Sequence, residues 1–156
     1  MTPDQISIVQ ETWKQVVPIA DAAGELFYRR LFEIDPSTCE LFRATDMPAQ
    51  RRKLLQMLAV AVRGLDNLDA LASTVEELGR RHAGYGVTDA HYDSVGAALL
   101  WTLQQGLGEA WTPAVAAAWT AAYGFLSGIM RRAAVRTHSA RTVRVASVPD
   151  QVAGPL

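Results

Sequence analysis

The chain has 156 residues, 49% of them hydrophobic, and a formal net charge of −1 at pH 7. That length suits one domain with a sizeable core, and the near-neutral charge excludes an ordinary nucleic-acid-binding protein. Cys39 is the single cysteine, which excludes an internal disulfide and a thiolate zinc cluster and suits a reducing compartment. We expect neither a leader nor a membrane-spanning segment, and therefore a soluble cytoplasmic protein that binds no membrane.

Helical periodicity runs through most of the chain, and strand alternation with hairpin turns is missing, so the fold class is predicted to be all-α. Thr2-Pro3, Asp35-Pro36 and Thr112-Pro113 each pair a capping residue with a proline that suits the first helical position. The expected elements, in chain order, are helices over 3–18 and 20–33, a short turn over 36–42, and helices over 48–64, 68–83, 88–108 and 112–136.

Beyond about Arg136 the periodicity is lost, and the segment is rich in Ser, Arg, Pro and Val. Such a composition is typical of a flexible end rather than of a packed helix. We therefore expect residues 1–136 to form one domain and residues 137–156 to be a disordered tail.

His82 lies in the stretch LGRRHAGYGV, Leu78 to Val87, near the expected end of a helix. A histidine there can be a charged residue at a helix terminus, a hydrogen-bonded core residue or a metal ligand. The sequence has no HExxH motif and no carboxylate–histidine pair at helical spacing, so a metal at His82 would have to bring its other ligands. Haem does this, because its porphyrin supplies four nitrogens and the protein need supply one imidazole.

Six stretches carry a resemblance to a known family: LFYRRLF with Tyr28, CELF with Phe42, QRRKLL with Gln50, LGRRHAGYGV with His82, HYDSVGAALL with Tyr92, and AAWTAAYGFL with Trp119. In order and spacing the chain resembles a globin, in particular a bacterial single-domain globin similar to neuroglobin-like chains and to the haem domain of flavohaemoglobins. The resemblance covers residues 3 to about 135. It implies a three-on-three helical sandwich around haem b.

By this resemblance His82 matches the proximal ligand of the haem iron, with its other ring nitrogen donating to a carbonyl near Leu78. Phe42 matches the aromatic residue that packs on the haem face. Tyr28 and Gln50 match the distal positions that offer a hydroxyl and an amide to bound gas, a combination that predicts slow oxygen release. From the residues themselves, Phe42 can equally be plain core, Tyr28 can place its hydroxyl at the surface, and Gln50 can be solvated.

The remaining matched positions are one basic residue and an apolar set. Lys53 matches a position that often lies over a haem propionate, and a solvated lysine is the alternative. The positions that match the lining of the haem cavity, and that ordinary core would also explain, are Leu54, Leu78, Val87, Tyr92, Val95 and Leu126.

Three departures from relatives bear on function. Neuroglobin-like chains have a histidine where Gln50 stands, and because an amide is a poor iron ligand we expect a five-coordinate ferrous form. Flavohaemoglobins continue into flavin- and nicotinamide-binding domains, whereas this sequence stops at Leu156, so we expect any reductase to be a separate protein. They also place a carboxylate near the proximal imidazole, but the matching region, Arg131 to Arg136, has none, although Tyr92 of the same network is kept.

Three functions follow as hypotheses from the resemblance. The first is reversible, high-affinity binding of dioxygen, and also of NO or CO, for storage or transport. The second is a nitric oxide dioxygenase that forms nitrate with a separate reductase. The terminal arginines could dock that reductase, although most simply they complement a helix C-terminus or stay solvated. The third and weakest is a gas sensor, because the expected tail is too short to be an output domain.

Overall fold

The computed structural model describes the chain from residue 1 to residue 143, with side chains up to Thr137. Within that part the regular elements are all helical, which confirms the predicted fold class. The α-helices are α1 (Pro3–Val16), α2 (Ala20–Ile34), α3 (Met47–Gly64), α4 (Leu68–Gly84), α5 (Asp89–Leu107) and α6 (Pro113–Val143). Three short 3₁₀ helices connect them: η1 (Val17–Ile19), η2 (Pro36–Phe42) and η3 (Gly108–Ala110).

Side-chain caps explain where several of these helices begin. Thr2 and Thr88 each form a capping box, with Gln5 and with His91, at the starts of α1 and α5. The Asp46 carboxylate accepts a hydrogen bond from the backbone N–H of Ala49 at the start of α3. These bonds satisfy backbone donors that the first helical turn leaves unpaired.

The end of the last helix differs from the prediction. We expected α6 to stop near Arg136, but its backbone continues to Val143, so residues 137–143 are helical and are not a disordered tail. This stretch reads THSARTV and has no apolar stripe, so hydrophobic periodicity could not signal that the helix continues through it. The rest of the expected tail, residues 144–156, lies outside the described residues.

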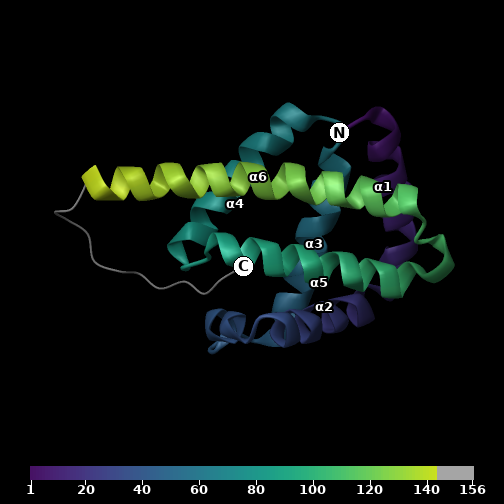
Figure 1. Ribbon diagram of the computed structural model, residues 1–156, viewed down its shortest axis with the longest axis horizontal. Helices are drawn as coiled ribbons and strands as arrows, with labels where there is room; N and C mark the ends of the chain where they lie inside the picture. The colour runs from purple at the N-terminus through teal and green to yellow at the C-terminus, as the bar shows by residue number, and fades with distance from the viewer. Residues whose placement is uncertain (144–156) are drawn as a thin grey trace.

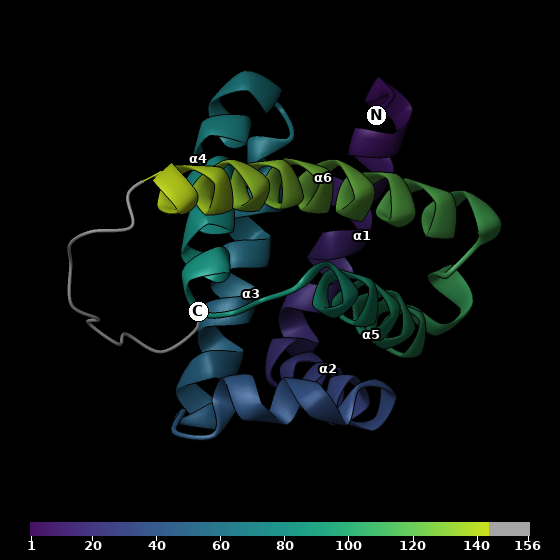
Figure 2. The same cartoon turned by 60° about the vertical axis from the view of Figure 1, so that its left-hand side comes forward.

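The helices form two crossing layers. In Figure 2, α1, α3 and α4 stand upright, while α6 runs across them near the top and α2 runs across near the bottom. Figure 1 shows α5 beside α6, with α2 below both. This is the three-on-three arrangement that the resemblance implied. The crossing leaves an interior space between α3 and α4 on one side and α2, α5 and α6 on the other, where the candidate site lies.

The core holds the layers together through apolar side chains and buried hydrogen bonds. Val9 of α1, Leu31 of α2 and Ala118 of α6 are almost completely buried. The indole Nε1–H of Trp119 donates to the hydroxyl of Thr12 at 2.9 Å, which satisfies a donor that burial would otherwise penalise. These contacts fix α6 against α1.

A glycine allows α4 and α6 to cross closely. At Gly79 of α4, an added Cβ would lie 2.6 Å from the Cα of Met130 on α6, so the two backbones are in direct contact there. Helix α4 ends at Gly84, two residues after His82, and Gly86 beyond it has a left-handed backbone with φ 86°.

Helix α6 bears on the expectation that the chain has no membrane-spanning segment. The segment Pro113–Thr137 of α6 is long and apolar enough to cross a bilayer by length and composition, and 33% of its most apolar window is buried in the protein. Trp119, Ala122 and Ile129 of this segment belong to the core. The helix therefore uses its apolar character, at least in part, to pack inside the fold.

Candidate functional site

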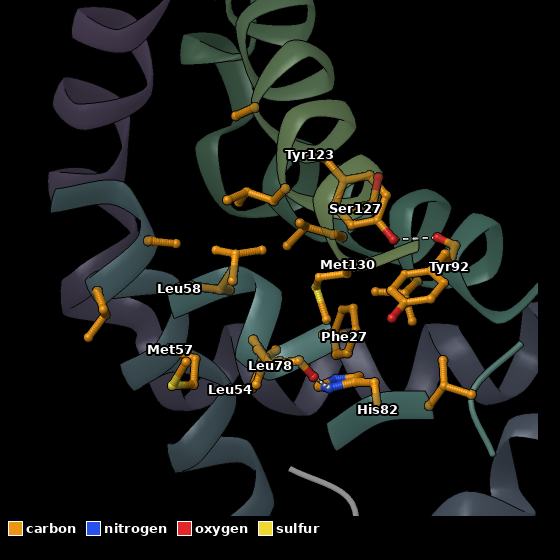
Figure 3. Close-up of a pocket in the computed structure, with 18 of the residues that line it drawn as sticks. Phe27, Leu54, Met57, Leu58, Leu78, His82, Tyr92, Tyr123, Ser127 and Met130 are labelled. Atoms are coloured by element: carbon orange, nitrogen blue, oxygen red, sulfur yellow. Dashed lines mark hydrogen bonds between the residues drawn. The ribbon is translucent and has the colours of Figure 1, made fainter. Parts of the chain in front are cut away.

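A cavity of about 210 Å³ lies between the two layers. Its walls come mainly from α2, η2, α3, α4, α5 and α6, with Val9 contributed by α1, and most of its lining side chains are apolar. Figure 3 shows Leu54 and Leu58 of α3, His82 of α4 and Met130 of α6 around this space. An apolar cavity with few polar groups is the usual form of a binding site for a small ligand or cofactor.

His82 is the polar group that α4 contributes to the cavity. Its Nδ1 lies 2.8 Å from the carbonyl oxygen of Leu78, one helical turn earlier. A carbonyl can only accept, so Nδ1 carries the proton and Nε2 keeps a free lone pair. Burial lowers the pKa of His82, with the bond to Leu78 opposing it, and this keeps the ring neutral. A neutral imidazole with one fixed nitrogen and one free nitrogen is suited to ligate a metal.

Tyr28 lines another part of the cavity and is hydrogen-bonded to Gln50. The amide Nε2 of Gln50 on α3 donates to the hydroxyl oxygen of Tyr28 on α2 at 3.1 Å. Both side chains are buried, at 5% and 2% exposed, which rules out the surface alternatives for both residues. Burial raises the pKa of Tyr28 to about 12, with the Gln50 bond opposing, so its hydroxyl stays protonated and can donate.

Phe42, at the end of η2, lies against Tyr28 in an edge-to-face contact with ring centroids 5.3 Å apart. Phe32 packs on both rings, at 5.9 Å from Phe42 and 6.1 Å from Tyr28. Offset and edge-on pairs of this kind add to the energy of burial and restrict ring motion. Phe42 is therefore both a core residue and a cavity wall.

The residues expected to contact a cofactor are brought to one cavity, with one exception. Those that line it are Phe42, Lys53, Leu54, Leu78, His82, Val87, Tyr92, Val95 and Leu126. Gln50 does not line the cavity and reaches it only through Tyr28. Lys53 is otherwise exposed, as a side chain at the cavity mouth would be. The contacts of these residues with a cofactor stay predictions.

Several lining residues were missed by the sequence reasoning. Met57, Leu58 and Ala61 follow Leu54 on the same face of α3, and Met130 lies one turn after Leu126 on α6. Helical spacing from the named residues could have found them. Leu41 and Thr38 of η2 had no such signal, because a short 3₁₀ helix has no long periodic stripe.

Tyr92 lines the cavity from α5 and lies beside Arg131 of α6. Its hydroxyl is buried and has no hydrogen-bond partner among the described residues. The guanidinium carbon of Arg131 lies 5.3 Å from the centroid of its ring, and Arg131 pairs with Asp93 at 2.7 Å. We expected the terminal arginines to complement a helix end or remain solvated. Arg131 is not at a helix end, because α6 continues beyond it to Val143. Its side chain joins α6 to α5 through Asp93.

The donor set and the lining fit haem. His82 Nε2 is the free imidazole nitrogen of the cavity wall, since His91, the other histidine there, uses both ring nitrogens. The Nδ1 of His91 accepts from the Thr88 N–H at 3.0 Å, and the Nε2 of His91 lies 3.4 Å from the Ser37 hydroxyl. No group of three or more His, Cys, Asp or Glu side chains that could hold a bare metal ion occurs in the described residues.

Comparison with known proteins gives a consistent family. A family model described as Globin matches residues 25–130. The flavohemoprotein of Vibrio cholerae is 33% identical over 83% of this chain, and that of Bacillus subtilis is 32% identical over 75%. This chain spans about a third of the length of those relatives, 33% and 31% respectively. An anaerobic nitrite reductase of Casuarina glauca is 29% identical over 78% of this chain and 85% of its own.

Solved structures agree. An engineered carbene transferase, the nitric oxide dioxygenase candidate of Rhodothermus marinus, superimposes with a TM-score of 0.79 and 26% identity over 91% of this chain and 99% of its own. A bacterial globin of Campylobacter jejuni gives a TM-score of 0.76 with 23% identity over 88% and 99%. At 23% identity, the likeness to the Campylobacter jejuni globin concerns the fold alone.

Proposed function

The chain belongs to the globin family, and from that premise we propose that it binds haem b through His82 and reversibly binds dioxygen with high affinity. Haem binding itself is what family membership implies. The observation that carries the proposal is the bond from His82 Nδ1 to the Leu78 carbonyl, which leaves Nε2 free beside an apolar cavity. When bound, haem would supply four nitrogen ligands to iron and leave one coordination position open to a gas.

Retention of dioxygen rests on Tyr28 in this proposal. Its hydroxyl oxygen accepts from Gln50, so its own proton remains available for a ligand inside the cavity. Gln50 then acts by orienting Tyr28, because it does not line the cavity itself. Because Tyr28 and Gln50 are already buried and hydrogen-bonded to each other, little further ordering of their side chains is needed when a gas binds. Slow oxygen release follows from this arrangement. NO and CO could enter the same position.

We also propose a five-coordinate ferrous form without bound gas. Gln50 stands where some relatives have a second histidine, and its amide is engaged with Tyr28. His91 is held by Thr88 and Ser37. These hydrogen bonds leave neither Gln50 nor His91 free to take the sixth position.

Absorption spectra of the reconstituted protein in ferric, ferrous, oxygen-bound and carbonyl forms test both statements. A high-spin ferrous spectrum that converts on adding carbon monoxide supports them. A sharp low-spin ferrous spectrum would contradict five-coordination and point to Lys53 or another internal ligand. No haem uptake at all would overturn the proposed function.

A second candidate function is a nitric oxide dioxygenase that combines nitric oxide and dioxygen with one electron from a separate reductase to give nitrate. The observation that favours it is the 26% identity to the Rhodothermus marinus protein over 91% of this chain. Sustained loss of nitric oxide, with a reduced nicotinamide nucleotide as electron donor and a purified bacterial flavin reductase present, supports this function. A single stoichiometric burst contradicts it and leaves the binding function.

We further propose a cytoplasmic location. The support is that Cys39 is the single cysteine and is exposed as a free thiol, which suits a reducing compartment. Fractionation of cells that express the tagged full chain tests this, and recovery in the membrane fraction would contradict it.

A further inference from the structure

Four polar side chains join η2 to α5 at the edge of the cavity: Asp35, Ser37, His91 and Ser94. We call them the clasp. Their neighbours Thr38, Tyr92 and Val95 line the cavity, as does His91 itself. Ser94 and Asp35 are outside the lining, so the clasp lies at the rim rather than within the cavity.

Asp35 is the centre of the clasp because both of its carboxylate oxygens are used. Oδ1 accepts from the backbone N–H of Ser37 at 3.1 Å and also from the Ser37 hydroxyl, which caps η2. Oδ2 accepts from the hydroxyl of Ser94 on α5 at 2.8 Å. The bonds from Ser37 and Ser94 hold the pKa of Asp35 below its usual range. One carboxylate therefore starts η2 and ties it to a residue 59 positions later in the chain.

His91 forms the second link. Its Nδ1 accepts from the backbone N–H of Thr88, which places its proton on Nε2, facing the Ser37 hydroxyl at 3.4 Å. The same ring thus caps α5 and approaches η2. The longer distance makes this link weaker than the one between Ser94 and Asp35.

The position of the clasp matters because η2 has few other attachments. It packs mainly against α2, yet it carries Thr38, Leu41 and Phe42 into the cavity. Among the hydrogen bonds recorded for residues 1–137, the two clasp links are those that join η2 and its capping residue to α5. Loss of these links would leave the η2 wall free to separate from the wall that carries Tyr92 and Val95.

We propose that the clasp holds these two walls together and so sets how slowly haem leaves the cavity. This rests on the proposed function, since it requires that haem is bound. The clasp residues are positioning residues, because they act through the walls and none is needed as an iron ligand.

The test is transfer of haem from the loaded full chain to an excess of a haem-free acceptor protein, followed by absorbance. Ser94→Ala removes the bond to Asp35 and leaves the cavity lining intact. We expect release about three- to tenfold faster, the effect of losing one ordinary hydrogen bond, because this one is only partly buried. Ser94→Thr keeps the hydroxyl and should restore slow release. Ser7→Ala, an exposed serine on α1, is the matched control.

A double-mutant cycle separates the clasp from general loosening of the protein. If Ser94 acts through Asp35, then Ser94→Ala should have little further effect in an Asp35→Ala background. Fully additive effects of the two substitutions would overturn the clasp. A release rate for Ser94→Ala equal to that of the wild type would do so as well. A wild-type chain that takes up no haem would instead overturn the proposed function, so the two failures are distinguishable.

Discussion

Tyr28 and Tyr92 line the same cavity from α2 and α5, and both are 5% exposed. The hydroxyl of Tyr28 is oriented by Gln50, whereas the hydroxyl of Tyr92 has no partner among the described residues. Beside Tyr92 the protein places the guanidinium of Arg131 over the ring, a contact that uses its face and not its hydroxyl. The same type of residue therefore has its hydroxyl fixed by a hydrogen bond on the α2 side of the cavity, and without a fixed partner among the described residues on the α5 side.

His82 is held by yet another kind of contact, a carbonyl of its own helix. His82→Ala is expected to have the largest effect, complete loss of protein coordination to haem iron, with helical content retained because that bond is local. Absorption and circular dichroism spectra measure the two properties. Added imidazole should restore coordination in the variant, which serves as its control. Wild-type coordination without imidazole would show that another residue is the ligand.

Tyr28→Phe tests the fixed hydroxyl. Oxygen release should become about 10- to 100-fold faster, the loss expected for one strong hydrogen bond. The same change strands the buried amide of Gln50, which should lower the free energy of unfolding by about 1–3 kcal/mol. Stopped-flow displacement and urea unfolding measure these effects. Tyr85→Phe, at the C-terminal cap of α4, is the matched control. An unchanged release rate would remove Tyr28 from gas binding.

Tyr92→Phe tests the hydroxyl without a fixed partner and should act in the opposite direction. Removing a buried hydroxyl that has no partner costs no hydrogen bond, so the free energy of unfolding should stay the same or rise by about 1 kcal/mol. The stacking with Arg131 survives, because a phenylalanine ring also accepts a cation on its face. Urea unfolding of the haem-free protein measures this. A loss of stability would mean that the hydroxyl has a partner in solution.

Alkaline pH should lower the free energy of unfolding through both tyrosines, an effect that is absent at neutral pH and is the smallest one predicted here. Burial raises the pKa of both Tyr28 and Tyr92 from 10.0 to about 12, since each ionised form is poorly solvated inside. A raised pKa in the folded state means that the stabilisation is complete below pH 10 and is lost as pH rises from about 10 to about 12. Each Tyr→Phe variant should flatten this decline, as unfolding at pH 8, 10 and 11 would show. An unchanged slope would contradict the shift.

Much of the fold could be predicted because its signals are local. Thr2 and Thr88 cap α1 and α5 through residues three positions away, and helical spacing marks the inner face of α3. The proximal role of His82 came from its matched neighbours, and the Leu78 bond was predictable because it lies within one turn. Local chemistry of this kind is contained in a short stretch of sequence.

The contacts that were missed join distant segments. Spacing indicates that Gln50 and Tyr28 could face a common space, but not that Gln50 lies behind Tyr28 and outside the cavity lining. From the sequence, Arg131 was predicted to be a charge at a helix end, whereas in the folded chain it forms an ion pair with Asp93 of α5. The link between Asp35 and Ser94 has no sequence signature. Periodicity defines the face of a helix, and only the crossing of helices defines its partner.

The close crossing at Gly79 has a consequence for how the site can vary. Gly79 lies one turn before His82, and its backbone touches that of α6 at Met130. Any larger residue would push α4 away from α6 and displace the imidazole with it, because His82 is bonded rigidly within the same helix. The position of the His82 imidazole therefore depends on the absence of a side chain at Gly79.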